Sequence, residues 1–371
     1  MHQSLPYRRP LSYAMARTHF REVAAASGAR LVTHHLPGRE ELGIDAEDLT
    51  IDVAELPCRD PSGPRLLISS GLHGLEGFAG SHAQTQWLLG LQDRELIPKY
   101  PIILVHSLNP YGFAMHRRWN EHGIDLNRNF RLDTEPYEGC PDAYRKLHDF
   151  INPSYAPRAF DSFWLEAPLQ LARFGQATLN QAIASGQYVY PRGLFFGGTE
   201  ASACKRFVDA ELQHWAGARD SRILHIDLHT GLGRKGEVQL FLDSPSSPEV
   251  LAQLRRSFHP RRIRGDDELV FEAPGAIGRY LAKVLGSRYC GLTLEMGTLS
   301  PATLFRLLRR ENQAHQVCGY ESDAARRARE TLLDAFAPQE TSWWESVMPK
   351  VIRTLWDAMD SLDEMYEPPQ A

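Results

Sequence analysis

The chain has 371 residues, 43% of them hydrophobic and 23% charged, with a formal net charge of −5. This composition is typical of a globular protein with a sizeable core, and the length allows two or three domains or one large α/β domain. The acidic balance excludes nucleic acid and anionic membranes as expected partners, and no apolar run approaches the length of a membrane span.

The first part of the chain alternates between predicted strands and helices. A strand, a helix and a further strand in succession predict a largely parallel sheet with helices on both faces. The strands at 30–35 and 49–54 are expected to pair antiparallel. In chain order the elements are a helix over 12–28, strands at 30–35 and 49–54, a short apolar strand at 66–68, a helix over 78–91 and a buried strand at 101–106.

The segment from about 134 to 187 interrupts this alternation. It begins with turn residues and continues with helical stretches, so we expect an insertion within the domain. A glycine- and aromatic-rich loop follows at 188–199. The later elements are helices at 201–215, 248–258, 301–316 and 321–335, and strands at 223–228, 238–242 and 291–295.

A last amphipathic helix, over 343–365, carries Trp344 and Trp356 in an apolar stripe. Such a stripe is typical of a packing face or a dimer contact, which leaves a homo-oligomer open. We divide the chain into a single domain, 1–336, with the insertion at about 134–187, and a C-terminal helical extension, 337–371, packed on it.

The five cysteines are scattered and never in CxxC spacing. This usage is typical of reduced thiols in a cytosolic protein, so we expect a cytoplasmic location and no cysteine-based metal site.

His73 and Glu76 lie on a glycine-rich turn after the strand at 66–68. An imidazole and a carboxylate three residues apart on a tight turn can converge on one cation, and zinc accepts both. A hydrolytic zinc site also needs a third protein ligand and an open position for water. The pair alone is weak evidence, because a histidine beside glycine is often only a turn residue.

Two further strand ends carry reactive residues, namely His229 and Glu295. Ligands in open α/β sheets bind outside the carboxyl ends of the strands, so these residues and the HxxE turn are expected at one edge. His225 is predicted to be a hydrogen-bonded core residue. Asp227 either orients a ligating imidazole or has a plain structural role.

A loop between the strands holds His116–Asn120, HRRWN, and Asp125–Phe130, DLNRNF. Guanidinium groups bind carboxylates in a bidentate manner, so this loop suits an anionic ligand. The alternative is a solvated loop with an internal salt bridge between Asp125 and Arg128, and the loop taken alone favours that alternative.

In their order, HxxE, DLNRNF, a lone strand-end histidine and TLEMGT resemble the zinc metallocarboxypeptidases of the carboxypeptidase A type, the funnelins. The resemblance covers roughly residues 60–300, and SGLHGLEGFAGS and DLHTGLG are most similar to a bacterial branch of these enzymes. It implies a zinc carboxypeptidase-like, or phosphorylase/hydrolase-like, α/β fold: a mixed, largely parallel twisted sheet with helices on both faces.

The resemblance also implies roles for individual residues. One Zn²⁺ per chain would be bound by His73, Glu76 and His229, the two-histidine, one-glutamate set of carboxypeptidase A. Glu295 would be the general base and then the general acid. The resemblance further implies that Arg118, with Arg117 as the less favoured choice, would stabilise the oxyanion. Asn127 and Arg128 would bind the terminal carboxylate of the substrate.

The sequence departs from the family in one place. The carboxypeptidases carry a mobile tyrosine some two dozen residues before the catalytic glutamate, where this chain has residues 269–275 and no tyrosine. The nearest one, Tyr280, is out of register. The pocket for the substrate side chain is expected near Ala276–Gly278, which offers no charged determinant.

We therefore expect a zinc-dependent hydrolase that cleaves an amide bond next to a free carboxylate, in a peptide or an N-acyl amino acid. A metallocarboxypeptidase is the first interpretation. The alternative is an N-acyl amino acid deacylase, similar to aspartoacylase and succinylglutamate desuccinylase, and a non-catalytic binding module that retains zinc is a third. The metal triad cannot separate the first two, whereas the full DLNRNF motif favours the peptidase.

Overall fold

The computed structural model describes residues 9–36, 47–218, 221–243, 248–258, 263–264 and 273–365, and every structural statement below concerns these residues. The strands are β1 (Arg30–His35), β2 (Thr50–Glu55), β3 (Arg65–Ser70), β4 (Ile102–His106), β5 (Ile223–Leu232), β6 (Val238–Leu242), β7 (Ile263–Arg264) and β8 (Tyr289–Leu299).

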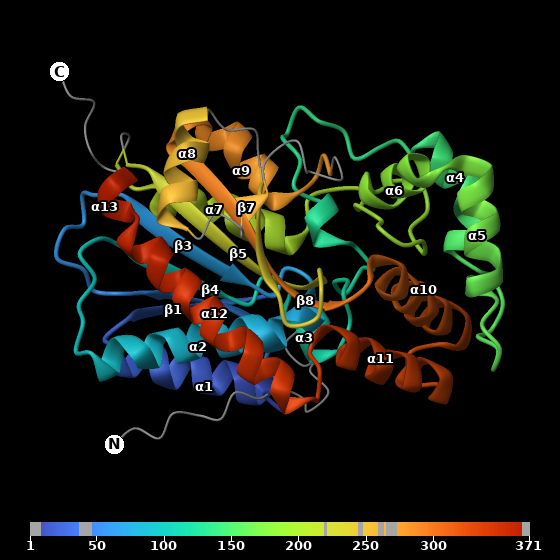
Figure 1. Ribbon diagram of the computed structural model, residues 1–371, viewed down its shortest axis with the longest axis horizontal. Helices are drawn as coiled ribbons and strands as arrows, with labels where there is room; N and C mark the ends of the chain where they lie inside the picture. The colour runs from blue at the N-terminus through green and yellow to red at the C-terminus, as the bar shows by residue number, and fades with distance from the viewer. Residues whose placement is uncertain are drawn as a thin grey trace.

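Helices follow most of the strands (Figure 1). The α-helices are α1 (Tyr13–Ala26), α2 (Gly77–Asp93), α3 (Pro110–Ala114), α4 (Asp142–Ile151), α5 (Phe163–Phe174), α6 (Gln176–Ala184), α7 (Ala203–Ala216), α8 (Pro248–Ser257), α9 (Ile277–Leu285), α10 (Pro301–Cys318), α11 (Asp323–Phe336), α12 (Thr341–Asp360) and α13 (Leu362–Met365). The 3-10 turns are η1 (Gly74–Glu76), η2 (Leu126–Arg128) and η5 (Gly286–Arg288).

The eight strands form one sheet in the order β1-β2-β4-β3-β5-β8-β6-β7. The central strands β4, β3, β5 and β8 are parallel to one another. The antiparallel pairs are β1 with β2, β2 with β4, and β8 with β6. The predicted mixed, largely parallel α/β sheet is therefore confirmed, and so is the antiparallel pairing of the first two strands.

Helices cover both faces of this sheet (Figure 1). Helices α1, α2 and α12 share one buried apolar cluster with Leu66 and Ile68 of β3. Helices α7 and α9 share a second cluster with Leu67, which lies between Leu66 and Ile68 in β3 and points to the other face. Side chains alternate between the faces of a strand, so a strand buried on both faces needs the continuous apolar run seen here.

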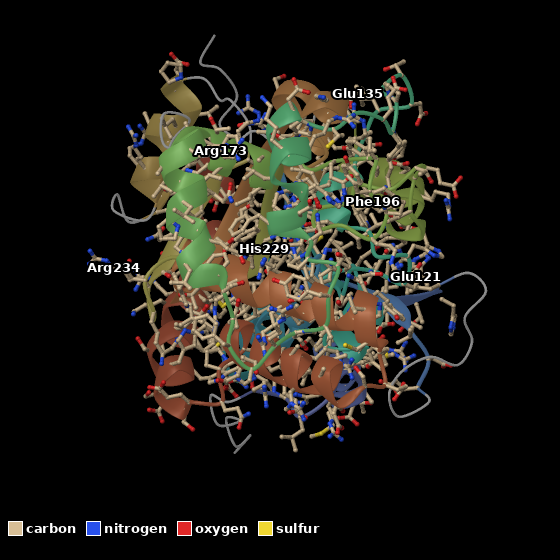
Figure 2. All side chains as sticks on the ribbon, turned by 90° about the vertical axis from the view of Figure 1, so that its right-hand side faces the viewer. Glu121, Glu135, Arg173, Phe196, His229 and Arg234 are labelled. Carbon is tan, nitrogen blue, oxygen red and sulfur yellow. The ribbon has the colours of Figure 1, made fainter. Side chains whose placement is uncertain are left out.

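Two central strands are longer than their patterns predict. β5 continues through His229 to Leu232, and β8 continues through Glu295 to Leu299. The two strands pair in one register from Ile223 and Tyr289 to Gly231 and Gly297, and the register shifts by one residue before Leu232. Each strand therefore supplies hydrogen-bond partners for the extension of the other. His229 therefore lies within a strand and is buried, near the middle of the view in Figure 2.

The insertion forms α4, α5 and α6, which lie beside α10 on the right-hand side of Figure 1. Arg309 of α10 is buried, donates from Nε to the carbonyl of Phe150, and pairs with Asp161 at 3.6 Å. Because a buried guanidinium needs partners for its donors, these contacts attach the insertion to α10.

The helix predicted over 343–365 is divided into α12 and the short α13, and α12 packs against α2, β6 and β8. Trp343 and Trp344 are both buried, and the indole of Trp344 donates to the carbonyl of Pro338 at 2.6 Å. This apolar face of α12 is thus part of the main core. Of the described helices, none combines the length and the hydropathy that a bilayer-spanning helix needs.

Replacement of Trp344 by alanine should lower the free energy of unfolding by about 3–5 kcal/mol, because it leaves a large cavity in the core. Urea unfolding, followed by circular dichroism, measures the change. The matched control is Trp164→Ala, since Trp164 is 52% exposed, and its effect should stay within about 0.5 kcal/mol. Equal effects of the two substitutions would contradict the packing of α12 described here.

Candidate metal centre

The HxxE motif lies on the turn that joins β3 to α2. Gly71 has a φ of +65°, and a Cβ on Gly74 would lie 2.0 Å from the backbone of Gly112. Residues other than glycine would be strained at both places. The turn η1 then brings Nδ1 of His73 to 3.0 Å from Oε1 of Glu76, so both side chains face the same space.

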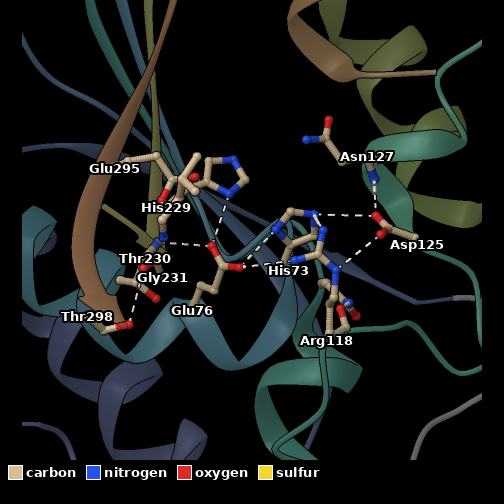
Figure 3. Close-up of polar contacts among 12 residues, drawn as sticks. His73, Glu76, Arg118, Asp125, Asn127, His229, Thr230, Gly231, Glu295 and Thr298 are labelled. Carbon is tan, nitrogen blue, oxygen red and sulfur yellow. Dashed lines mark hydrogen bonds and ion pairs between the residues drawn. The ribbon is translucent and has the colours of Figure 1, made fainter. Parts of the chain in front are cut away.

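His229 on β5 completes a triad with His73 and Glu76 (Figure 3). Its Nδ1 is 3.0 Å from Oε2 of Glu76, which also accepts from the backbone N–H of Thr230 at 3.0 Å. One candidate ligand atom from each residue of the triad lies within 4.8 Å of the other two. Within the described residues, this is the one group of three or more metal-ligating side chains that converge in this way.

The charges of the triad suit a cation. Burial raises the pKa of Glu76, but His73 and His229 lower it more, and the pKa of this carboxyl lies below its usual range. Burial lowers the pKa of His229, but Asp227 and Glu76 outweigh burial and hold the pKa well above its usual value. A metal ion bound by the lone pairs of His229 and Glu76 would displace any proton that the two share. Two imidazoles and one carboxylate form a donor set that fits zinc.

Each imidazole of the triad has a carboxylate on its other side. Nε2 of His73 is 3.3 Å from Oδ1 of Asp125, and Nε2 of His229 is 2.7 Å from Oδ2 of Asp227. Carboxylates in this position fix the ring orientation and raise the basicity of the ligating nitrogen. Of the two roles open to Asp227 from the sequence, the contact favours orientation of an imidazole.

The sequence patterns did not indicate the part played by Asp125. Its expected salt bridge was to Arg128, but the carboxylate instead pairs with Nε of Arg118 at 3.1 Å and faces His73. Asp125 is buried, and it also caps η2, where Oδ1 accepts from the backbone N–H of Asn127 at 3.1 Å. The prediction that His225 is a buried hydrogen-bonded residue is confirmed.

Glu295 is the β8 partner of His229 in the sheet register, so both side chains point to the same face. The carboxylate is half-buried and accepts from the backbone N–H of Leu232 at 3.3 Å. Burial raises the pKa of Glu295 to about 8, against the lowering effect of His229. A divalent cation beside it would lower that pKa and favour the ionised, basic form.

Arg118 also lies at the triad (Figure 3). Its Nη2 is 2.7 Å from Nε2 of His73, and its Nη1 is 3.4 Å from Oε1 of Glu76. Only 11% of the side chain is exposed. The guanidinium is therefore within reach of a group bound at the triad.

Arg117 lies elsewhere. Its Nε pairs with Oε1 of Glu311 on α10 at 2.7 Å, and its Nη1 is 3.1 Å from Nε2 of His315. Both Arg117 and Glu311 are buried. The contacts of Arg117 thus do not support the expected role in substrate binding, because its donors are engaged with α10.

Asn127 and Arg128 lie on η2, next to Asp125. Oδ1 of Asn127 accepts from the backbone N–H of Ile277 at 3.1 Å. Arg128 is buried, its Nη1 donates to the carbonyl of Asn127 at 2.9 Å, and its Nε has no hydrogen-bond partner. No carboxylate among the described residues forms a salt bridge with Arg128. A buried guanidinium without a direct counter-ion favours an anionic ligand.

The region of the missing tyrosine is described only in part, since residues 269–272 lie outside the described residues. Tyr280 is buried on α9 and donates to Asp209, so it is engaged elsewhere. The side-chain pocket expected near Ala276–Gly278 stays a prediction. A Cβ on Gly278 would lie 2.3 Å from Oδ2 of Asp243, a carboxyl just after the end of β6 whose pKa burial raises to about 7.

Glu311→Ala should lower the free energy of unfolding by about 3–5 kcal/mol, because it leaves Arg117 as an unpaired buried charge. Urea unfolding measures this. The double variant Arg117→Met/Glu311→Leu should recover most of the loss, since an apolar pair in place of a buried ion pair is often neutral. A double variant with the summed losses of the two single variants would contradict a direct pair.

A family model described as "Protein of unknown function (DUF2817)" matches residues 10–350. The chain belongs to the DUF2817 family. Curated proteins give no match to this DUF2817 chain.

Solved structures that the DUF2817 chain resembles include metallocarboxypeptidases. The metallo-carboxypeptidase from Pseudomonas aeruginosa, solved with (2-guanidinoethylmercapto)succinic acid, is 14% identical, with a TM-score of 0.46 over 96% of this chain and 71% of that chain. Carboxypeptidase A from Helicoverpa armigera is 13% identical, with a TM-score of 0.45 over 87% of this chain and 73% of that chain. Succinylglutamate desuccinylase from Chromobacterium violaceum is 16% identical, with a TM-score of 0.39 over 87% and 74%.

Proposed function

We propose that this DUF2817 protein is a zinc-dependent hydrolase of the metallocarboxypeptidase type, which cleaves an amide bond next to a free carboxylate. The observation that carries the proposal is the convergence of His73, Glu76 and His229, each imidazole with a carboxylate on its far side, beside Glu295. A structural zinc site is closed by four protein ligands, whereas three ligands and a neighbouring free carboxylate are typical of a hydrolytic one.

In this proposal His73, Glu76 and His229 hold one zinc ion per chain. A bound zinc lowers the pKa of its water towards about 7 and polarises a carbonyl. Asp227 keeps the imidazole of His229 oriented through its Nε2 atom. Nε2 of His73 lies between Asp125 at 3.3 Å and the guanidinium of Arg118 at 2.7 Å, and these two side chains fix the place of that ring.

Glu295 takes the proton of the attacking water and delivers it to the leaving amine. It lies next to His229 on the same face, and its pKa lies above the range of an exposed carboxylate. A general base works best with a pKa near the working pH, because it must be both ionised and basic. Among the described residues, the backbone N–H of Leu232 donates to Oε2 of Glu295, which leaves Oε1 for the water.

Two arginines serve two charges on the substrate. Arg118, beside His73 and Glu76, stabilises the oxyanion, which for a single donor contributes about 3–4 kcal/mol in the transition state. Arg128, buried and near Asp125 but in no salt bridge with a described carboxylate, binds the free carboxylate with the help of Asn127. A fixed carboxylate sets which amide bond reaches the triad, and this is how specificity for a terminal residue arises.

Glu295→Gln should lower kcat by a factor of about 10²–10⁴ and leave zinc near one ion per chain, because the amide keeps the shape and loses the base. Mass spectrometry of the metal and hydrolysis of a panel of blocked dipeptides and N-acyl amino acids measure both. The panel separates the peptidase from the deacylase. Zinc uptake with no hydrolysis by the wild type over the whole panel would favour a non-catalytic binding module instead.

Arg128→Met should remove the preference for a free carboxylate. The wild type is expected to hydrolyse a substrate with a free carboxylate faster than its amidated analogue, since the buried guanidinium pairs with the anion. In the variant the two kcat/KM values should become similar, through a higher KM for the free acid. An unchanged ratio would show that another group binds the carboxylate.

A further inference from the structure

A chain of buried hydrogen bonds runs from Tyr289 on β8 to His229. Oη of Tyr289 is 2.8 Å from Nδ1 of His225, whose Nε2 is 2.7 Å from Oγ of Ser69. Oγ of Ser69 donates to Oδ1 of Asp227 at 2.5 Å, and Oδ2 of Asp227 is 2.7 Å from Nε2 of His229. All five side chains are buried. The first three have no part in the proposed reaction.

The number of protons sets the direction of each bond. A carboxylate only accepts, so the single hydroxyl proton of Ser69 goes to Asp227. Oγ of Ser69 then accepts from His225, which places a proton on Nε2 of that ring. Burial lowers the pKa of His225 to about 4, so the ring is neutral at pH 7 and its Nδ1 accepts from the phenol of Tyr289.

The sheet register explains why Asp227 needs this support. The terminal torsion of an aspartate is broad, and one hydrogen bond to His229 leaves the carboxylate free to turn. Ser69 on β3 is the register partner of Asp227 on β5, and it holds the other oxygen. With both oxygens bound, Oδ2 is kept as the acceptor for His229.

We propose that Tyr289, His225 and Ser69 are positioning residues that fix the tautomer of His229, with the proton on Nε2 and the lone pair of Nδ1 directed to the metal. The inference rests on the proposed function, since it names the metal-binding atom of that site. Nδ1 of His229 already faces Glu76, 3.0 Å from Oε2 (Figure 3).

The chain offers a matched control. Oγ of Ser81 on α2 lies 2.9 Å from Nε2 of His106 on β4, and both side chains are buried. This is a second buried serine–histidine bond of similar length. It has no hydrogen bond to the triad among the described residues.

The test measures zinc affinity on the full chain after metal removal, by competition with a chromophoric chelator at fixed pH. Ser69→Ala and His225→Leu should each weaken zinc binding by up to about 10-fold, less than the about 10–100-fold typical of losing a direct partner of a ligating histidine, because Asp227 itself remains. Ser81→Ala should leave the affinity unchanged. His225→Gln should restore most of it, because the amide nitrogen can donate to Ser69 from the place of Nε2.

A direct readout of the tautomer comes from ¹⁵N nuclear magnetic resonance of the zinc-loaded wild type and Ser69→Ala proteins. The expected state of His229 in the wild type is protonated Nε2, with bound Nδ1. Protonated Nδ1 in the zinc-loaded wild type would overturn the proposal. The wild-type spectrum alone decides this point, whether or not a variant folds.

The outcomes separate this inference from the proposed function. Equal zinc affinity in wild type, Ser69→Ala and Ser81→Ala would overturn the orienting role and leave the hydrolase proposal standing. An equal loss in Ser69→Ala and Ser81→Ala would also overturn it, because it would show a general loosening of the core. A wild type that takes up no zinc would overturn both proposals.

Discussion

The in-register pairing of β5 with β8 is the constraint on which the candidate site depends. It places His229 beside Glu295 on one face, and the parallel pairing of β3 with β5 brings the HxxE turn to the same edge. Side chains alternate along a strand, so a slip of one residue would send His229 and Glu295 to opposite faces. The apolar residues on both faces of these strands hold that register. The core thereby determines the geometry of the polar site.

The balance of buried charge around the triad explains why it suits a divalent cation. The carboxylates there are Glu76, Asp125, Asp227 and Glu295, and the guanidinium groups are Arg118 and Arg128. Four negative and two positive charges leave an excess of two negative charges. The pKa values of His229 and Glu295 are both raised, that of His229 by Asp227 and Glu76 against burial and that of Glu295 by burial. In the proposed function a divalent cation would offset the excess of negative charge, and His229 and Glu295 would then serve as ligand and base.

Local patterns predict the sheet, its helices and the positions of His73, Glu76, His229 and Glu295. The alternation of apolar and polar residues and the choice of turn residues can both be recognised within short stretches of sequence. They do not predict partners from distant segments. Asp125 has Arg128 three residues away, yet its carboxylate faces His73 and Arg118. The extension of β5 past His229 likewise depends on β8, since each strand provides the other's hydrogen bonds.

The two adjacent arginines show the same limit most clearly, and they connect the site to the rest of the molecule. No pattern distinguishes Arg117 from Arg118, because the choice is made by Glu311 on α10, which binds Arg117 and turns it away from the triad. The carbonyls of both arginines accept from η1, Arg117 from Leu75 at 3.0 Å and Arg118 from Gly74 at 3.2 Å. The ion pair with α10 thus fixes the backbone that supports the HxxE turn. Because α10 also binds the insertion through Arg309, the insertion, the loop that carries Arg117 and Arg118, and the HxxE turn form one connected support.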